Sequence, residues 1–140
     1  WPELRNTIMA LLQQESELEE IVKLVGADSL SESDKMILET AKSIREDYLH
    51  QNAFHEVDTY TSLLKQYKML RVIVRFHNKC MEAVGEGVTV DRLNALTVKE
   101  RIGRMKYIPE QEIDEKFAQI EKEIDVQIEN LVSKEELEHA

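Results

Sequence analysis

Apolar residues recur at steps of three and four along most of this chain, and this period limits the fold more than any other feature of the sequence. The clearest run lies over residues 63–84, where the two steps alternate over about six helical turns. Its members are Leu63, Tyr67, Leu70, Val74, His77, Met81 and Val84. No alternating strand pattern of useful length occurs. The period therefore predicts helices that each bury one face.

The same period predicts helices over 4–25, 31–48, 97–105 and 109–131. It fails over 51–58, where we expect a loop. The last helix has a narrow apolar stripe with charge on its other sides, which suits packing on a bundle or pairing with another helix. We expect an all-α fold, a bundle of about five helices, and a single domain spanning 1–140.

Capping residues mark several of the expected helix starts. Ser31 followed by Asp34 is a shortened relative of the capping box. Thr89 is placed to cap a short turn, and Thr97 with Glu100 forms a capping box of the usual spacing. These signals predict that the helices start at defined residues.

The chain is acidic, with 28 acidic against 18 basic side chains and a formal net charge of −10. A domain that binds nucleic acid or an anionic membrane surface would carry a basic excess, so we expect no nucleic-acid partner. No apolar run approaches the roughly 20 residues of a membrane span, and no direct membrane insertion is expected. Residues 133–140 combine one large apolar residue with repelling charges and are expected to fray.

Several catalytic patterns do not occur in the sequence. None of the four glycines begins a phosphate-binding loop, and there is no Gly-x-Ser-x-Gly elbow. Cys80 is the single cysteine, which fits a reducing compartment and a small, semi-buried side chain. Because the chain starts at Trp1 rather than at a methionine, we expect it to be a piece of a longer protein.

Two parts of the sequence that contain histidine are considered as possible sites. His55, Glu56 and Asp58 lie close together in the expected loop, with His50 five residues earlier. They lack the spacing of known zinc sites, so loop hydrogen bonds and a cap on the next helix are favoured over a metal or acid–base site. His77 lies on an apolar stripe, which favours a neutral imidazole with a backbone partner.

Basic residues recur at near-helical spacing within 59–81, a segment that contains no acidic residue. They are Lys65, Lys68, Arg71, Arg75 and Lys79. This basic face would suit an anionic partner or a phosphate. Mixed charged faces are common, however, so a solvated face or an internal match to the acidic last helix is favoured.

Two segments resemble the catalytic subunits of rotary ATPases. Residues 24–35 read LVGADSLSESDK and resemble the helix–turn–helix whose F-type form carries the motif DELSEED, with five of its seven positions matched. Residues 44–60 read IREDYLHQNAFHEVDTY and are similar to the sequence that follows in the catalytic A subunit of archaeal A-type and related V-type ATPases. The resemblance covers most of the chain and weakens in the acidic tail.

The resemblance implies the C-terminal helical domain of a longer subunit that also has a barrel and a P-loop nucleotide-binding domain. Such subunits alternate with B subunits around a rotating central stalk. The parent subunit would be an enzyme that uses Mg-ATP and Mg-ADP and couples ATP synthesis and hydrolysis to proton or sodium transport. It would lie in the cytoplasm, peripheral to the membrane. The domain itself would hold no catalytic residue, metal or cofactor.

The resemblance also implies roles for particular residues. Phe54 matches the aromatic residue that packs against the adenine of ATP. The expected contacts with the central stalk are Asp28, Ser29, Leu30, Ser31, Glu32, Ser33 and Asp34. Two serines, at 29 and 33, stand where the F-type motif has glutamates, so packing rather than acidic attraction should transmit movement. We expect the turn to protrude, with Leu30 as an exposed apolar contact.

Two alternatives remain open at this point. A free-standing helical adaptor would use the basic face or the acidic last helix to dock a partner. A small enzyme would be centred on His55, Glu56 and Asp58. The adaptor is favoured over the enzyme.

Overall fold

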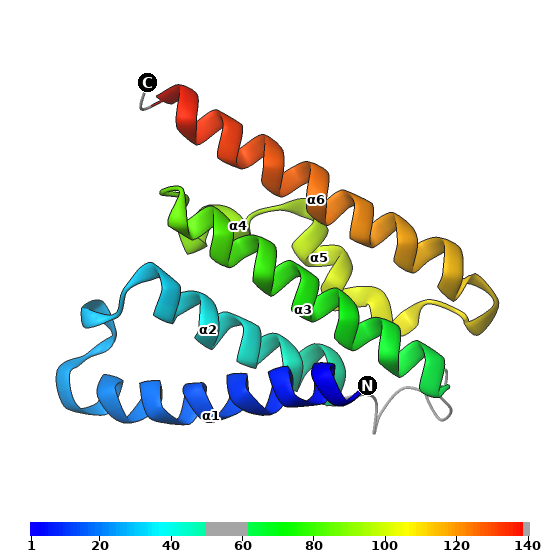
Figure 1. The fold of residues 1–140 in the computed structure, drawn as a ribbon, viewed down its shortest axis with the longest axis horizontal. Coiled ribbons are helices and arrows are strands. Elements are labelled where there is room, and N and C mark those ends of the chain that lie inside the picture. Colours follow the sequence, from blue (N-terminus) through cyan, green and yellow to red (C-terminus); the bar gives the residue numbers. More distant parts are fainter. Residues whose placement is uncertain (50–61, 139–140) are drawn as a thin grey trace.

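The computed structural model describes residues 1–49 and 62–138, and within them it contains six α-helices and no strand (Figure 1). The bounds are α1 Pro2–Val25, α2 Glu32–Ser43, α3 Leu63–Gly85, α4 Val90–Asn94, α5 Thr97–Arg104 and α6 Ile113–Glu138. A π-helical segment, Ile44–Leu49, continues α2. The all-α prediction is confirmed, and the additional helix is α4, which the sequence indicated as a short capped turn.

The long helices lie side by side, with α3 in the middle (Figure 1). α1 and α2 form an antiparallel hairpin on one side of α3, and α6 packs on the other side. α4 and α5 carry the chain back, so that α6 runs parallel to α3. Consistent with this direction, two ion pairs between α3 and α6 join residues that are each 50 positions apart.

α3 lies at the centre of the hydrophobic core. Val72, Ile73 and Val74 are consecutive and all buried, which a single apolar stripe cannot provide. Both α2 and α6 pack on this helix, so it is covered on more than one side. Leu63, by contrast, is 72% exposed although it belongs to the predicted stripe. The stripe on α6 is confirmed, with Ile113, Phe117, Ile120, Ile124 and Ile128 all buried.

The helix starts confirm two of the capping predictions. The hydroxyl oxygens of Ser31 and Thr89 accept hydrogen bonds from backbone N–H groups three residues later, at 3.1 and 3.4 Å. The capping box at Thr97 is wrong, because α5 begins after Leu96 and Thr97 already lies in the helix. Its hydroxyl instead accepts from Gln127 Nε2 of α6 at 2.9 Å. The Thr97 hydroxyl thus makes a tertiary hydrogen bond in place of the local helix cap that the sequence pattern predicts.

The acidic C-terminal segment is helical as far as the structure describes it. α6 continues through Glu138, so the fraying expected from residue 133 does not match residues 133–138. Glu135 is buried and forms an ion pair with Arg92 of α4. This pair attaches the segment to the bundle. In the sequence, the charge of Glu135 indicates only repulsion within residues 133–140.

Candidate functional site

The turn between α1 and α2 contains the residues that were expected to contact a stalk. α1 ends at Val25 because Gly26 adopts a φ of +89°, a conformation that side chains disfavour. A 3₁₀ turn, Ala27–Ser29, follows, and the Ser29 hydroxyl donates to the carbonyl oxygen of Gly26 at 2.7 Å. The turn forms one end of the molecule in Figure 1, as expected for a protruding hairpin.

Leu30 is buried, with 8% of its surface exposed, so the prediction that it is an exposed apolar contact is wrong. It joins the 3₁₀ turn to α2 in an extended conformation, while Ser29 and Ser31 on either side remain exposed. The physical reason is the free energy of burial, which is about 1.5–3 kcal/mol for a leucine side chain. Leu30 therefore anchors the turn to the hairpin.

Three other apolar residues at the end of α1 are exposed instead. Ile21, Leu24 and Val25 are 44%, 83% and 64% exposed, and we call them the apolar tip. Their spacing of three and four residues places them on one side of the helix. The sequence period does not indicate this surface, because Ile21 and Val25 continue the apolar period of 4–25, whose members are expected to be buried. The available signal was a widening of the stripe, since positions 21, 22, 24 and 25 are all apolar.

The polar residues of the turn divide into two groups. Asp28, Ser29 and Ser31 are exposed, whereas Glu32, Ser33 and Asp34 are half-buried. Glu32 and Asp34 lie in the first turn of α2, where negative charge is favourable next to the positive end of the helix dipole. Three of these side chains are thus available to a partner, and their contact with a stalk stays a prediction.

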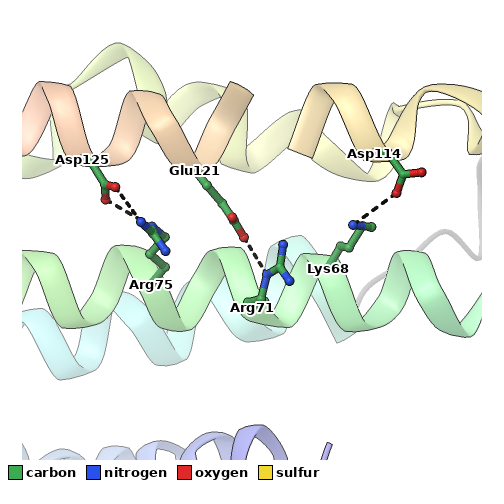
Figure 2. Close-up of polar contacts among 6 residues, drawn as sticks. All are labelled: Lys68, Arg71, Arg75, Asp114, Glu121 and Asp125. Carbon is green, nitrogen blue, oxygen red and sulfur yellow. Dashed lines mark hydrogen bonds and ion pairs between the residues drawn. The ribbon is translucent and has the colours of Figure 1, made fainter. Parts of the chain in front are cut away.

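The basic face of α3 is matched internally by α6, as Figure 2 shows for three ion pairs. Lys68 Nζ lies 3.3 Å from Asp114 Oδ1, and Arg71 Nε donates to Glu121 Oε1 at 2.7 Å. Arg75 binds Asp125 through two hydrogen bonds, of 2.5 and 3.1 Å. Lys65 Nζ donates to the backbone carbonyl of Lys106 at 2.7 Å. The favoured interpretation, an internal match to the acidic last helix, is confirmed for Lys68, Arg71 and Arg75.

The ion pairs also shift the titration of their members. The hydrogen bonds from Arg75 lower the pKa of Asp125, and the same contact raises the pKa of Arg75. The hydrogen bond to Glu121 likewise raises the pKa of Arg71. A charge that is held in this way is less available to an anionic ligand. The basic face therefore serves to fix α6 on α3.

His77 and Cys80 are buried in the core on α3. His77 Nδ1 lies 2.6 Å from Thr40 Oγ1 of α2, so its partner is a side chain and not the expected backbone group. Burial lowers the pKa of His77, which favours the predicted neutral imidazole. Cys80 is fully buried, and burial raises the pKa of its thiol to about 12. Cys80 is thus more buried than expected, and its thiol is unsuited to nucleophilic chemistry.

The expected loop site lies outside the described residues. His50, His55, Glu56 and Asp58 all fall there, as does Phe54, so the adenine contact stays a prediction. Among the residues that the structure describes, no group of three His, Cys, Asp or Glu side chains is placed to hold a metal ion. None of the described helices is both long and apolar enough to cross a bilayer.

These observations define a class: a helical-bundle domain in which α6 is fixed to α3 by ion pairs and a hairpin ends in an exposed apolar tip. The chain belongs to the family described as the C-terminal domain of V and A type ATP synthase, whose model matches residues 1–94. The resemblance seen in the sequence is thereby confirmed.

Similar proteins agree with the family assignment. The chain is 58% identical over 135 residues to the V-type ATP synthase alpha chain of Acetivibrio thermocellus. It is 55% identical over 132 residues to the A subunit of the A-type ATP synthase of Methanopyrus kandleri, and 53% identical over 130 residues to the V-type ATP synthase alpha chain of Clostridioides difficile. These matches cover 93–96% of this chain and 22–23% of each relative. The chain therefore spans less than a quarter of their length, and the family extends beyond archaeal sequences to bacteria.

Proposed function

We propose that this chain is the domain that couples the catalytic alpha or A subunit of a rotary ATPase to the central stalk. The relatives are named as alpha chains and A subunits of ATP synthases, which supports a parent enzyme that synthesises and hydrolyses ATP. In that enzyme Mg-ATP would bind in the adjacent nucleotide-binding domain, and B subunits and stalk subunits would be the partners. The enzyme would transport protons or sodium ions, with this domain on the cytoplasmic side.

The observation that carries the proposal is the apolar tip at the end of the α1–α2 hairpin. Leu24 is 83% exposed, although burial of a leucine is favourable by about 1.5–3 kcal/mol. Exposed apolar residues that gather on one side of a helix are typical of protein contacts. The tip therefore takes over the role that the family resemblance suggested for Leu30.

The hairpin has the properties of a lever. α1 contains 24 residues, which corresponds to a length of about 36 Å. Glu15 near its middle is buried and pairs with Arg45 in the segment that follows α2. Closely packed interiors transmit strain instead of absorbing it. A movement of the nucleotide-binding domain would thus be carried along the hairpin to the tip, where Leu24 would push the stalk.

The test compares two exposed leucines in the parent enzyme. Leu24→Asp should lower the number of ions pumped per ATP hydrolysed in reconstituted vesicles, because a charge at the tip opposes apolar contact with the stalk. Leu137→Asp is the matched control, since Leu137 is 78% exposed and lies near the end of α6. It should leave pumping and hydrolysis unchanged. Normal pumping by Leu24→Asp, with normal hydrolysis, would refute the role of the tip.

The adaptor alternative has lost one of its two surfaces. It required the basic face of α3 or the acidic last helix to be free for a partner. Lys68, Arg71 and Arg75 pair with α6 instead, so these three members of the basic face are already occupied within the chain. An adaptor would also bind its partner tightly without other ATPase subunits, whereas the rotary proposal expects weak binding until the ring is assembled.

A further inference from the structure

The boundary between α3 and α6 changes in character along its length. At its start, basic residues of α3 pair with acidic residues of α6 (Figure 2). The pairs Arg71–Glu121 and Arg75–Asp125 share a register of 50 residues. Farther along the boundary the acidic residues Glu82 and Glu86 follow on the α3 side and Glu129 and Glu136 on α6, so negative charge lines both sides. Arg75 and Asp125 form the last of the three ion pairs along this boundary in Figure 2.

Beyond this point the boundary opens into a groove of about 590 Å³. Ala83 and Ile128, which are buried, and Val132, which is half-buried, contribute apolar surface to it. The carboxylates along its edges belong to Glu82, Glu86, Glu129 and Glu136, and all four residues are exposed. Among the described residues that line it, Lys79 is the one basic residue. The groove thus combines an apolar interior with acidic edges on both helices.

The four carboxylates are not used within the described part of the chain. Neither an ion pair nor a side-chain hydrogen bond joins Glu82, Glu86, Glu129 or Glu136 to another described residue. This contrasts with Asp114, Glu121 and Asp125 nearer the start of α6, each of which pairs with a basic residue of α3. The groove therefore has charge that a partner could neutralise.

We propose that this groove, bounded by residues 79–86 at the end of α3 and by residues 128–136 of α6, binds a basic amphipathic helix of another protein. Its apolar side chains would lie on Ala83, Ile128 and Val132, and lysines or arginines on its flanks would pair with the carboxylates. Binding of an amphipathic helix in a groove between helices is a common mode of recognition. The proposal does not depend on the coupling role of the hairpin.

Charge and spacing argue against other occupants. A second copy of this chain is disfavoured because each copy carries a net charge of −10 and would bring acid to acid. A phosphate or nucleic acid would meet the same repulsion. A single divalent cation is disfavoured because no three acidic side chains of the described residues converge on one point. The partner that fits is cationic and apolar together.

The experiment titrates the chain, labelled for NMR, with a synthetic helical peptide of about 14 residues that has leucines on one face and lysines beside them. Shift changes should concentrate in residues 79–86 and 128–136. Glu82→Gln combined with Glu136→Gln should weaken binding about tenfold, since two charge pairs are lost. Glu17→Gln combined with Glu19→Gln removes the same charge from exposed positions of α1 and should change affinity less than about twofold.

A steric variant separates the groove from its charge. Ser133 is exposed and lines the groove, so Ser133→Trp should abolish binding without changing the net charge. Ser16→Trp, at an exposed position of α1, is its control and should bind normally. Circular dichroism would verify that every variant is folded.

Three results would overturn the proposal. Equal losses of affinity in the two double glutamine variants would mean that peptide binding depends only on the net charge of the chain. Saturable shifts in the groove with Mg²⁺ alone, and none with the peptide, would identify a cation site. Self-association that depends on Glu82 and Glu136 would identify a second copy of the chain as the occupant.

Discussion

Leu30→Ala should destabilise the domain although Leu30 lies in a turn at the end of a hairpin. Its side chain is 8% exposed, so nearly the full transfer free energy of the removed carbons is lost. Three carbons at about 0.8 kcal/mol each correspond to about 2.4 kcal/mol. A turn at the edge of a bundle relaxes more easily than a central helix, so the cavity left behind should add little. We expect a loss of about 2–3 kcal/mol in the free energy of unfolding.

Leu24→Ala is the matched control for this prediction. Leu24 lies six residues away in the same hairpin and is 83% exposed. Surface substitutions of this kind usually change stability by less than about 0.5 kcal/mol. The two variants remove the same atoms, so the difference between them measures burial alone.

Urea unfolding followed by far-UV circular dichroism provides the measurement. With a slope of about 2 kcal/mol per molar urea, the midpoint for Leu30→Ala should fall by about 1–1.5 M, and the slope should stay unchanged. Leu24→Ala should shift the midpoint by less than about 0.3 M. Midpoints that are equal for the two variants would refute the argument, because Leu30 would then be as solvated in the folded domain as Leu24.

Two further predictions concern α3. A double-mutant cycle with Arg75→Ala and Asp125→Ala should give a coupling free energy of about 0.5–1 kcal/mol at low salt, because the pair is bidentate but partly exposed. This coupling should shrink in 1 M salt, and zero coupling at low salt would contradict the role of the pair in fixing α6 on α3. His77 has a lowered pKa in the folded state, so its contribution to stability is present above the unfolded pKa of about 6.5 and is lost as the pH falls toward the folded value. Between about pH 7.5 and 5.5, the free energy of unfolding measured with urea should therefore fall less steeply for His77→Gln than for the unchanged chain. Identical pH dependences would exclude a contribution from the protonation of His77.

The helices themselves could be predicted from the sequence because their signals are local. The period of three and four residues acts within two turns, and Gly26 and Ser31 end and start helices through contacts that span at most four residues. Thr97 shows where this reasoning ends, because its hydroxyl binds Gln127 thirty residues later. A local pattern cannot show that a distant donor competes for the same oxygen.

The candidate site could be predicted only in part, for the same reason. The family resemblance indicated the α1–α2 turn, and the turn does lie at one end of the molecule. The residue chosen within it was wrong, because Leu30 and Leu24 look equally able to be buried or exposed in the sequence. Their positions relative to α2 decide between them, and this depends on how the hairpin closes.

The sequence alone determined the all-α class, most helix boundaries, the acidic balance and the family, because each depends on neighbouring residues or on their order. The tertiary structure decided which charges are paired and which apolar residues are exposed. Arg75 and Asp125 are 50 residues apart and meet only because α6 returns parallel to α3. Burial and pairing are properties of two surfaces in contact, and a surface has no partner until the chain has folded.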